Sequence, residues 1–296
     1  MTASAASGQA LPSALATLLA ATNGRHEAEW EGRSVVLINQ AWGSLILSLQ
    51  GAQLLHFAPH GQAPWLWTSS VPKPVPAAIR GGIPLCWPWF ADREDGQGPA
   101  HGYARTANWR LDACEEEAEG VELHLSPVEA LDPQLSPRVV IQANAQRLRI
   151  ELITEHRGDT PVKFTQALHS YFAVANAHTC RVEGLAGATY LDKLRGMREF
   201  EQAGELAIRG ELDRIYHSNR SLVLVDPRTN GERRLSIAKE GSDSSVIWHP
   251  GDKPPGDVAE AELLEFLCVE AACTRLDPIW LAPGGQHLLA QQITLL

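Results

Sequence analysis

Short segments in which apolar and polar residues alternate run through most of this 296-residue chain. In segment 121–125 three apolar residues alternate with Glu122 and His124, and in segment 148–152 three alternate with Arg149 and Glu151. Successive side chains of a β-strand point to opposite faces, so this spacing predicts strands with one buried face. Gly, Pro, Asn and Asp separate the segments, which favours antiparallel connections. We therefore predict an all-β fold, a large antiparallel β-sandwich with few short helices.

Further segments have the composition of strands, and two others do not. Strands are expected at 34–39, 45–49, 162–168, 221–225, 245–248, 267–272 and 287–296, and a helical turn at 258–264. Segment 71–99 is rich in proline and aromatic residues, and segment 192–215 is charged and irregular. We expect both to form long structured loops, where sites on a rigid sandwich are commonly found.

No linker divides the chain convincingly. Residues 1–22 are predicted to be an N-terminal extension with a short helix at 12–21, and residues 23–296 a single β-sandwich domain. The first cationic residue, Arg25, follows the apolar stretch, unlike the pattern of a signal peptide. Five cysteines without a Cys-x-x-Cys pair favour reduced thiols, and hence a cytoplasmic protein. The net charge of −10 and the lack of a basic cluster disfavour nucleic-acid binding.

Glu270 lies in the otherwise apolar run 266–273. In a strand it shares a face with Phe266, Cys268 and Ala272, so its carboxylate is expected to be paired or to have a raised pKa. Such a group can act as a general base near neutral pH. It can equally be a buried partner in an ion pair, or face water from an edge strand.

His169 stands in a second apolar and aromatic run, 164–172. A histidine there can be a general acid near neutral pH, or a core residue that donates to a backbone carbonyl. Ser170 does not form a nucleophile pair with it, because adjacent strand side chains diverge.

Two arginines occur in loops rich in glycine, proline and aromatic residues. Arg80 precedes two glycines that permit a close approach of ligand, and Arg105 closes the segment 101–105. Together they could hold a phosphate, or each could pair with a surface carboxylate.

Several motifs for cofactor binding are missing from the sequence. It has no Gly-x-Gly-x-x-Gly after a strand, no phosphate-binding Gly-x-x-x-x-Gly-Lys loop and no His-Glu-x-x-His. His56 and His60 are separated by Pro59, which does not suit a metal-binding helix face. We therefore predict no cofactor and no metal.

Five segments together resemble one protein family. They are RGGIPLCWPWF (80–90), HGYAR (101–105) followed by Trp109, LHSYF (168–172), GLAGATYLD (184–192) and CVEA (268–271). In this order they resemble the glucose-6-phosphate 1-epimerases, or hexose-6-phosphate mutarotases, of the galactose-mutarotase-like superfamily. The resemblance covers about residues 30–296 and implies a large antiparallel β-sandwich, in agreement with the strand pattern.

The resemblance also implies roles for individual residues. Glu270 matches the general base and His169 the general acid. Arg80 and Arg105 match arginines that bind the substrate phosphate. Asp192 matches an acidic residue that contacts sugar hydroxyls, and His101 a histidine on the same loop as Arg105. Some relatives bind substrate through a glutamine before the His-Gly pair, and Ala100 stands at that position here.

The implied reaction is the interconversion of the α and β anomers of a hexose 6-phosphate by ring opening and closure. The expected partner is a small sugar phosphate, with no nucleic acid or membrane, and the chain is expected to be a monomer. Two alternatives stay open at this point. The chain could act on an unphosphorylated aldose, or it could be a non-catalytic sugar-binding protein or sensor of the same fold.

Overall fold

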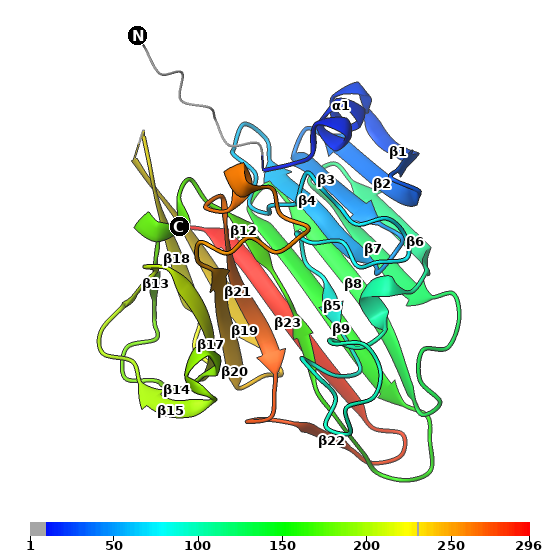
Figure 1. Cartoon of the computed structure of the whole chain (residues 1–296). Helices are drawn as coiled ribbons and strands as arrows, with labels where there is room; N and C mark the ends of the chain where they lie inside the picture. Colours follow the sequence, from blue (N-terminus) through cyan, green and yellow to red (C-terminus); the bar gives the residue numbers. More distant parts are fainter. Residues whose placement is uncertain (1–9, 230) are drawn as a thin grey trace.

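The computed structural model describes residues 10–229 and 231–296, and about half of them lie in four antiparallel sheets (Figure 1). The largest sheet has nine strands. In spatial order they are β16 (Leu206–Ala207), β13 (Arg181–Glu183), β18 (Leu222–Arg228), β19 (Gly231–Glu240), β23 (Gln286–Leu295), β9 (Arg147–His156), β8 (Leu135–Asn144), β7 (Gly120–Pro127) and β6 (Trp109–Glu117).

The second sheet has eight strands and packs on the first. Its order is β15 (Arg198–Glu201), β14 (Thr189–Asp192), β17 (Glu211–His217), β20 (Ser244–Pro250), β21 (Phe266–Cys273), β11 (Gln166–Leu168) and β5 (Leu85–Cys86), and β12 (Tyr171–Ala173) also pairs with β21. The Gln291 amide of β23 donates to the Val269 carbonyl of β21 at 3.0 Å. This bond joins the two sheets directly beneath the segment that carries Glu270.

Smaller elements complete the fold. A four-stranded sheet contains β1 (Gly24–Trp30), β2 (Arg33–Gln40), β3 (Gly43–Ser48) and β4 (Gln53–Pro59), and β10 (Val162–Phe164) pairs with β22 (Ile279–Leu281). The helices are α1 (Ser13–Ala21) and the 3₁₀ turns η1 (Ala104–Thr106), η2 (Ala177–Thr179), η3 (Lys193–Arg195) and η4 (Glu260–Glu262). The helix α1 lies beside β1 and β2 (Figure 1). Its Leu15 side chain is fully buried against the four-stranded sheet.

The period-two pattern places one face of each long strand in the core. In β7 the residues Val121, Leu123 and Leu125 are buried, while their polar neighbours are only partly buried. The main apolar cluster joins residues from Val36 to Ile293 and draws on the nine-stranded, eight-stranded and four-stranded sheets. The predicted all-β antiparallel sandwich is confirmed.

The expectation for segment 192–215 is wrong. The structure places β15, β16 and most of β17 there, and β15 extends the edge of the eight-stranded sheet. These strands are short, and three of the four β15 residues are exposed. A strand that packs so little apolar surface leaves only a weak hydrophobic signal in the sequence. Segment 71–99 is irregular as expected, apart from the two residues of β5.

The predicted domain division involves residues that the structure does not describe. Residues 1–9 of the predicted extension lie outside the described part of the chain. The helix α1 occurs where the sequence predicts one. Within the described residues, no helix combines the length and the apolar character needed to span a membrane. The division into an extension and a single domain stays a prediction.

Gly82 offers a test of how closely the loop that carries Arg80 packs against β4. Gly82 has φ +57°, and a Cβ there would overlap the Leu54 carbonyl of β4. We expect Gly82→Ala to lower the free energy of unfolding by about 3 kcal/mol or to prevent folding, because the loop must move away from β4. Gly61→Ala is the matched control: its φ is +72°, but no atom lies within 4 Å of the added Cβ. It should cost only about 1 kcal/mol for the left-handed conformation. Equal losses in urea titrations of the two variants would contradict the close packing.

Candidate active site

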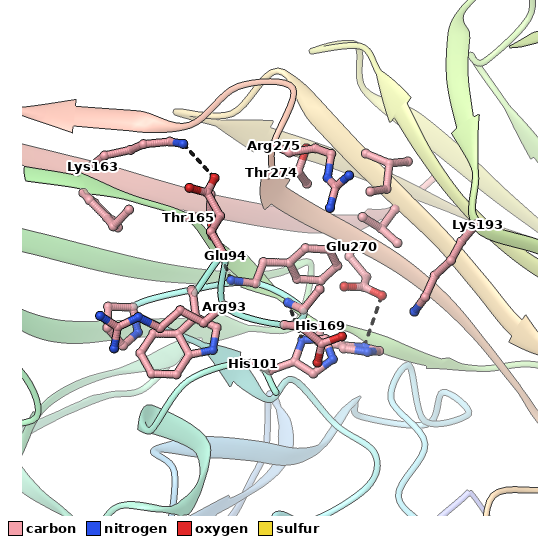
Figure 2. A pocket seen from close by; sticks show the side chains of 18 of the residues that line it. Arg93, Glu94, His101, Lys163, Thr165, His169, Lys193, Glu270, Thr274 and Arg275 are labelled. Atoms are coloured by element: carbon pink, nitrogen blue, oxygen red, sulfur yellow. Dashed lines mark hydrogen bonds and ion pairs between the residues drawn. The ribbon is translucent and has the colours of Figure 1, made fainter. Parts of the chain in front are cut away.

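Strand pairing brings His169 and Glu270 together, although 100 residues separate them in the sequence. Leu168 pairs with Ala271 and Tyr171 pairs with Cys268, so the residues between them lie opposite Glu270 on β21. The His169 Nδ1 atom is 3.3 Å from Glu270 Oε1 (Figure 2). The Ser170 hydroxyl points the other way and donates to Gln291 of the nine-stranded sheet. Alternation along one short segment therefore sends His169 outward and Ser170 into the core.

The pair lies in the wall of a cavity of about 1060 Å³. The cavity is bounded by the loop after β5, by side chains from the middle of β17, β20 and β21, and by the turn η3. Besides the pair, its lining includes Arg80, Phe90, His101, Lys193, Asp213 and Trp248. A hollow with a few polar groups among aromatic side chains is typical of a small-molecule site.

Burial governs the protonation of the pair. Burial raises the pKa of the Glu270 carboxyl well above its ordinary value; the nearby Asp213 adds to the shift and Lys193 opposes it. Burial likewise lowers the pKa of the His169 imidazole well below its ordinary value, and His101, Arg80 and Arg105 act in the same direction. The apolar surroundings therefore favour a protonated carboxyl beside a neutral imidazole over an ion pair. Both forms hold one proton, so the two groups titrate as a unit.

Both members of the pair have polar atoms without a hydrogen bond. Glu270 is 2% exposed, yet its Oε2 atom has no hydrogen-bond partner, and His169 Nδ1 lies close to Glu270 Oε1 without the geometry of a hydrogen bond. Buried polar atoms are nearly always satisfied in folded proteins. Unsatisfied atoms beside a cavity are therefore a reason to expect that a ligand contacts them.

Asp213 and Lys193 belong to the cavity but are not among the residues singled out from the sequence. Lys193 Nζ lies 3.2 Å from Asp213 Oδ2, and Figure 2 shows Lys193 reaching toward Glu270. Burial raises the pKa of Asp213, while Lys193 lowers it. The one sequence feature that could have pointed to Asp213 is its place in segment 211–217, among residues that suit a strand. Its position opposite Trp248 of β20 depends on pairing that the sequence does not reveal.

His101 lines the cavity as a neutral imidazole. Its Nδ1 accepts a hydrogen bond from the Ala91 backbone N–H at 3.2 Å, so the ring proton is assigned to Nε2. Burial lowers the pKa of His101 to about 3, with Arg105, Lys193 and Arg80 acting in the same direction. The ring packs edge-on against His169, with centroids 5.6 Å apart. His101 can therefore donate one hydrogen bond without carrying charge.

Arg80 also lines the cavity and is held from two sides. Its Nε donates to Asp257 Oδ1 at 2.6 Å, and its Nη1 donates to the Tyr171 hydroxyl at 3.0 Å. Arg80 therefore does pair with a carboxylate, which was one of the two roles considered from the sequence. Its partner is a buried aspartate and not a surface carboxylate. The guanidinium remains about one quarter exposed, so it is accessible to a ligand in the cavity.

Two of the predicted site residues are not among those lining the cavity. Arg105 donates through Nη2 to the Ala100 carbonyl at 2.7 Å. Asp192 is 3% exposed; it accepts from the Leu194 N–H at the start of η3 and lies 3.4 Å from the Arg214 guanidinium. The structure thus gathers four of the six predicted residues around one cavity: Glu270, His169, Arg80 and His101. The substrate contacts predicted for Arg105 and Asp192 stay predictions.

Three potential metal ligands meet at the same place. The ligand atoms of His169, Cys268 and Glu270 lie within 4.8 Å of one another. Burial, followed by the nearby Glu270, raises the pKa of the Cys268 thiol well above its ordinary value. A protonated thiol is a poor ligand for metals that prefer sulfur. The Cys268 thiol is therefore neutral beside His169 and Glu270.

The chain is similar to a family of sugar epimerases and to proteins named after that activity. The family model described as aldose 1-epimerase matches residues 33–294. A relative from Escherichia coli (strain K12) named "Putative glucose-6-phosphate 1-epimerase" is 31% identical over 76% of this chain and 78% of its own length. One of the same name from Cenchrus ciliaris is 31% identical over 75% of this chain and 71% of its own length. The crystal structure of a "putative mutarotase" from Salmonella typhimurium superimposes with a TM-score of 0.85 at 25% identity, covering 95% of this chain and 99% of that one.

The raised pKa of Glu270 predicts that its charge destabilises the fold. A carboxyl whose pKa is higher in the folded than in the unfolded state stabilises the folded state fully below its ordinary pKa of about 4.5. That contribution is lost as the pH rises toward the pKa of the folded state. Glu270→Gln should therefore increase the free energy of unfolding by about 1 kcal/mol or more at pH 8, and by less at pH 6. Thermal unfolding of the variant and the wild type at both pH values measures this difference.

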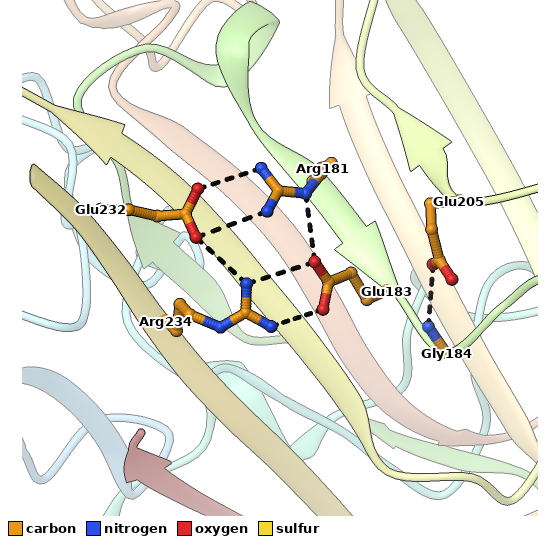
Figure 3. Close-up of polar contacts among 6 residues, drawn as sticks. All are labelled: Arg181, Glu183, Gly184, Glu205, Glu232 and Arg234. Atoms are coloured by element: carbon orange, nitrogen blue, oxygen red, sulfur yellow. Dashed lines mark hydrogen bonds and ion pairs between the residues drawn. The ribbon is translucent and has the colours of Figure 1, made fainter.

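Glu183 provides the control with the opposite sign. Glu183 of β13 and Glu232 of β19 share a surface network with Arg181 and Arg234 (Figure 3). Hydrogen bonds from Arg234 and Arg181 lower the pKa of Glu183 despite some burial. Glu183→Gln should leave the melting temperature unchanged or lower it. A Glu270→Gln variant that melts below the wild type at pH 8 would contradict the assignment of a destabilising carboxylate.

Proposed function

The chain belongs to the aldose 1-epimerase family, and from this premise we propose that it interconverts the α and β anomers of glucose 6-phosphate and of related hexose 6-phosphates. The observation that carries the proposal is the contact between His169 and Glu270 in the wall of one cavity. The reaction needs one proton removed from the anomeric hydroxyl and one delivered to the ring oxygen. A carboxylate and an imidazolium that face the same space can do both.

The proposed cycle conserves the proton count of the pair. Glu270, as the carboxylate, takes the proton of the anomeric hydroxyl while protonated His169 gives its proton to the ring oxygen. The C1–O5 bond breaks, and an open-chain aldehyde forms between a neutral carboxyl and a neutral imidazole. C1 then rotates, and the same transfers in reverse close the ring on the other face. Burial favours the neutral pair, so it lowers the free energy of the ring-opened state relative to the ion-paired state.

Other cavity residues would hold the sugar in place. Arg80 binds the phosphate, and His101 donates to a sugar oxygen through Nε2. Asp213, paired with Lys193, accepts from sugar hydroxyls, the role that the resemblance gives to Asp192. Asp192 would act indirectly, because its carboxylate caps the turn η3 that carries Lys193. No cofactor is required by this scheme.

Arg105 would join the phosphate site only by exchanging its bond to the Ala100 carbonyl for the phosphate. That bond is the specific observation favouring the second candidate function, which is the same reaction on an unphosphorylated aldose. The two candidates use the same acid and base. They differ in whether the phosphate lowers KM.

The remaining expectations follow the same proposal. We propose a cytoplasmic monomer whose partner is the small sugar phosphate, without a nucleic-acid or membrane partner. The net charge of −10 supports the absence of a nucleic-acid partner, since it repels a phosphate-rich polymer.

Exchange between the two anomeric C1 proton signals of glucose 6-phosphate tests the proposal. Wild type at catalytic concentration should exchange magnetisation between the signals faster than buffer alone. Glu270→Gln and His169→Ala should each lower the rate constant by about 10²–10⁴-fold, the contribution of a well-placed acid or base. Glu183→Gln, on the far surface network, should keep the wild-type rate.

The same assay with glucose separates the alternatives. A lower KM for glucose 6-phosphate than for glucose supports the phosphorylated substrate, and equal values favour the unphosphorylated aldose. A wild-type protein that exchanges neither sugar faster than buffer would refute the enzymatic proposal and leave the sugar-binding alternative.

A further inference from the structure

Two loops that are distant in sequence meet beside the cavity and hold Arg80 between them. The Ser69 hydroxyl donates to the Asp257 carbonyl at 2.7 Å, and the Ser70 N–H donates to the Glu262 carboxylate at 3.2 Å. Arg80 Nε adds the bond to Asp257 Oδ1 at 2.6 Å. Segments 69–80 and 257–262 are therefore joined at several points, and Arg80 lies where they meet.

Asp257 is the centre of this junction. Its side chain is 6% exposed, and both carboxylate oxygens face a cation: Oδ1 faces Arg80, and Oδ2 lies 3.7 Å from Lys73 Nζ. A buried carboxylate needs such partners, since it has lost its contact with water. The same contact restrains the Nε edge of the guanidinium, so the Arg80 side chain cannot rotate freely.

The rest of the guanidinium is restrained by aromatic residues. Nη1 donates to the Tyr171 hydroxyl, and the group lies 5.9 Å from the ring centroid of Trp248. The Tyr171 ring in turn stacks on His169, with centroids 4.9 Å apart and planes 7° apart. Within the described part of the chain Nη2 makes no hydrogen bond. Arg80 thus has a fixed position relative to His169 and retains free donors.

We propose that Asp257 is a positioning residue that orients Arg80 to receive the phosphate of the substrate, an inference that rests on the proposed function. A planar guanidinium recognises phosphate best in one orientation, and arginine is a long side chain with many rotamers. Ordering it before the ligand arrives removes that cost from the binding step. The anchored phosphate then fixes how far C1 lies from His169 and Glu270.

Asp257 could also act in the opposite direction, because its negative charge repels a phosphate dianion. Lys73 offsets part of this charge at 3.7 Å. The two effects have opposite consequences when the side chain is removed. Loss of orientation weakens phosphate binding, whereas loss of repulsion strengthens it. The sign of the change therefore distinguishes a positioning residue from a repulsive neighbour.

The test compares Asp257→Ala with Asp257→Asn. Calorimetry with glucitol 6-phosphate, which has no aldehyde and cannot close a ring, gives Kd, and the exchange assay gives KM and kcat for glucose 6-phosphate. Asp257→Ala should raise Kd and KM about tenfold, equivalent to about 1.4 kcal/mol. Its kcat should change less than about threefold. Asp257→Asn keeps an acceptor for Arg80 Nε–H and should recover most of the affinity. The KM for glucose should stay unchanged in both variants.

Asp226→Ala is the matched control. Asp226 is equally buried and pairs with Arg228 at 2.7 Å and Arg233 at 3.1 Å, but it does not line the cavity. It should lower the melting temperature without changing Kd for glucitol 6-phosphate. The inference is overturned if Asp257→Ala binds this ligand as tightly as wild type or more tightly, or if Asp226→Ala weakens binding equally.

A measurement on the wild type covers the case in which Asp257→Ala fails to fold. The Arg80 Nε–H signal in ¹H–¹⁵N spectra, assigned by its loss in Arg80→Lys, should exchange slowly with water and report a rigid side chain without ligand. A rapidly exchanging, mobile signal would overturn the inference. Failure of the proposed function is recognised separately, because wild type would then not accelerate anomer exchange whatever the result with glucitol 6-phosphate.

Discussion

The burial of one carboxylate in an apolar sheet is the constraint to which the rest of the site is fitted. Glu270 lies on the face of β21 that borders the cavity and is only 2% exposed, so its charged form costs free energy wherever it is not compensated. The fold supplies an imidazole at 3.3 Å instead of an arginine or lysine in direct contact. An imidazole can exchange a proton with the ligand that Glu270 also contacts. An ion pair with an arginine or lysine would instead keep the carboxylate permanently ionised. The destabilising group and the reactive group are thus the same.

The sandwich makes this arrangement possible through strand register. The short strands β11 and β12 both pair with β21, and the two residues between them, His169 and Ser170, point in opposite directions. Ser170 is bonded to the nine-stranded sheet, which fixes the backbone from which His169 projects. Loops then bring Arg80 and His101 to the open side. The rigid part of the molecule positions the proton carriers, and the loops position the groups that recognise the sugar.

The sequence predicts the parts that rest on local chemistry. Alternation of apolar residues gives the strands, and two polar residues in apolar runs, His169 and Glu270, mark the site. Pairing between distant strands leaves no such signal, so the sequence does not mark Asp213 and Lys193 as site residues. The short strands within 192–215 bury little apolar surface and leave only a weak pattern. Asp257 was missed for the same reason, because its partner Arg80 is 177 positions away. Asp192 rests on the resemblance alone, and Arg105 rests on its loop and on the resemblance. Neither source specifies which way a side chain points.

The central claim is that Glu270 and His169 act as one unit on one hemiacetal. A double-mutant cycle on the rate of anomer exchange of glucose 6-phosphate tests it directly, with Glu270→Gln, His169→Asn and the two combined. If both proton transfers belong to one step, the double variant loses no more rate than the poorer single variant, because either change already disables the unit. Losses that multiply in the double variant would show two independent contributions and would contradict the account.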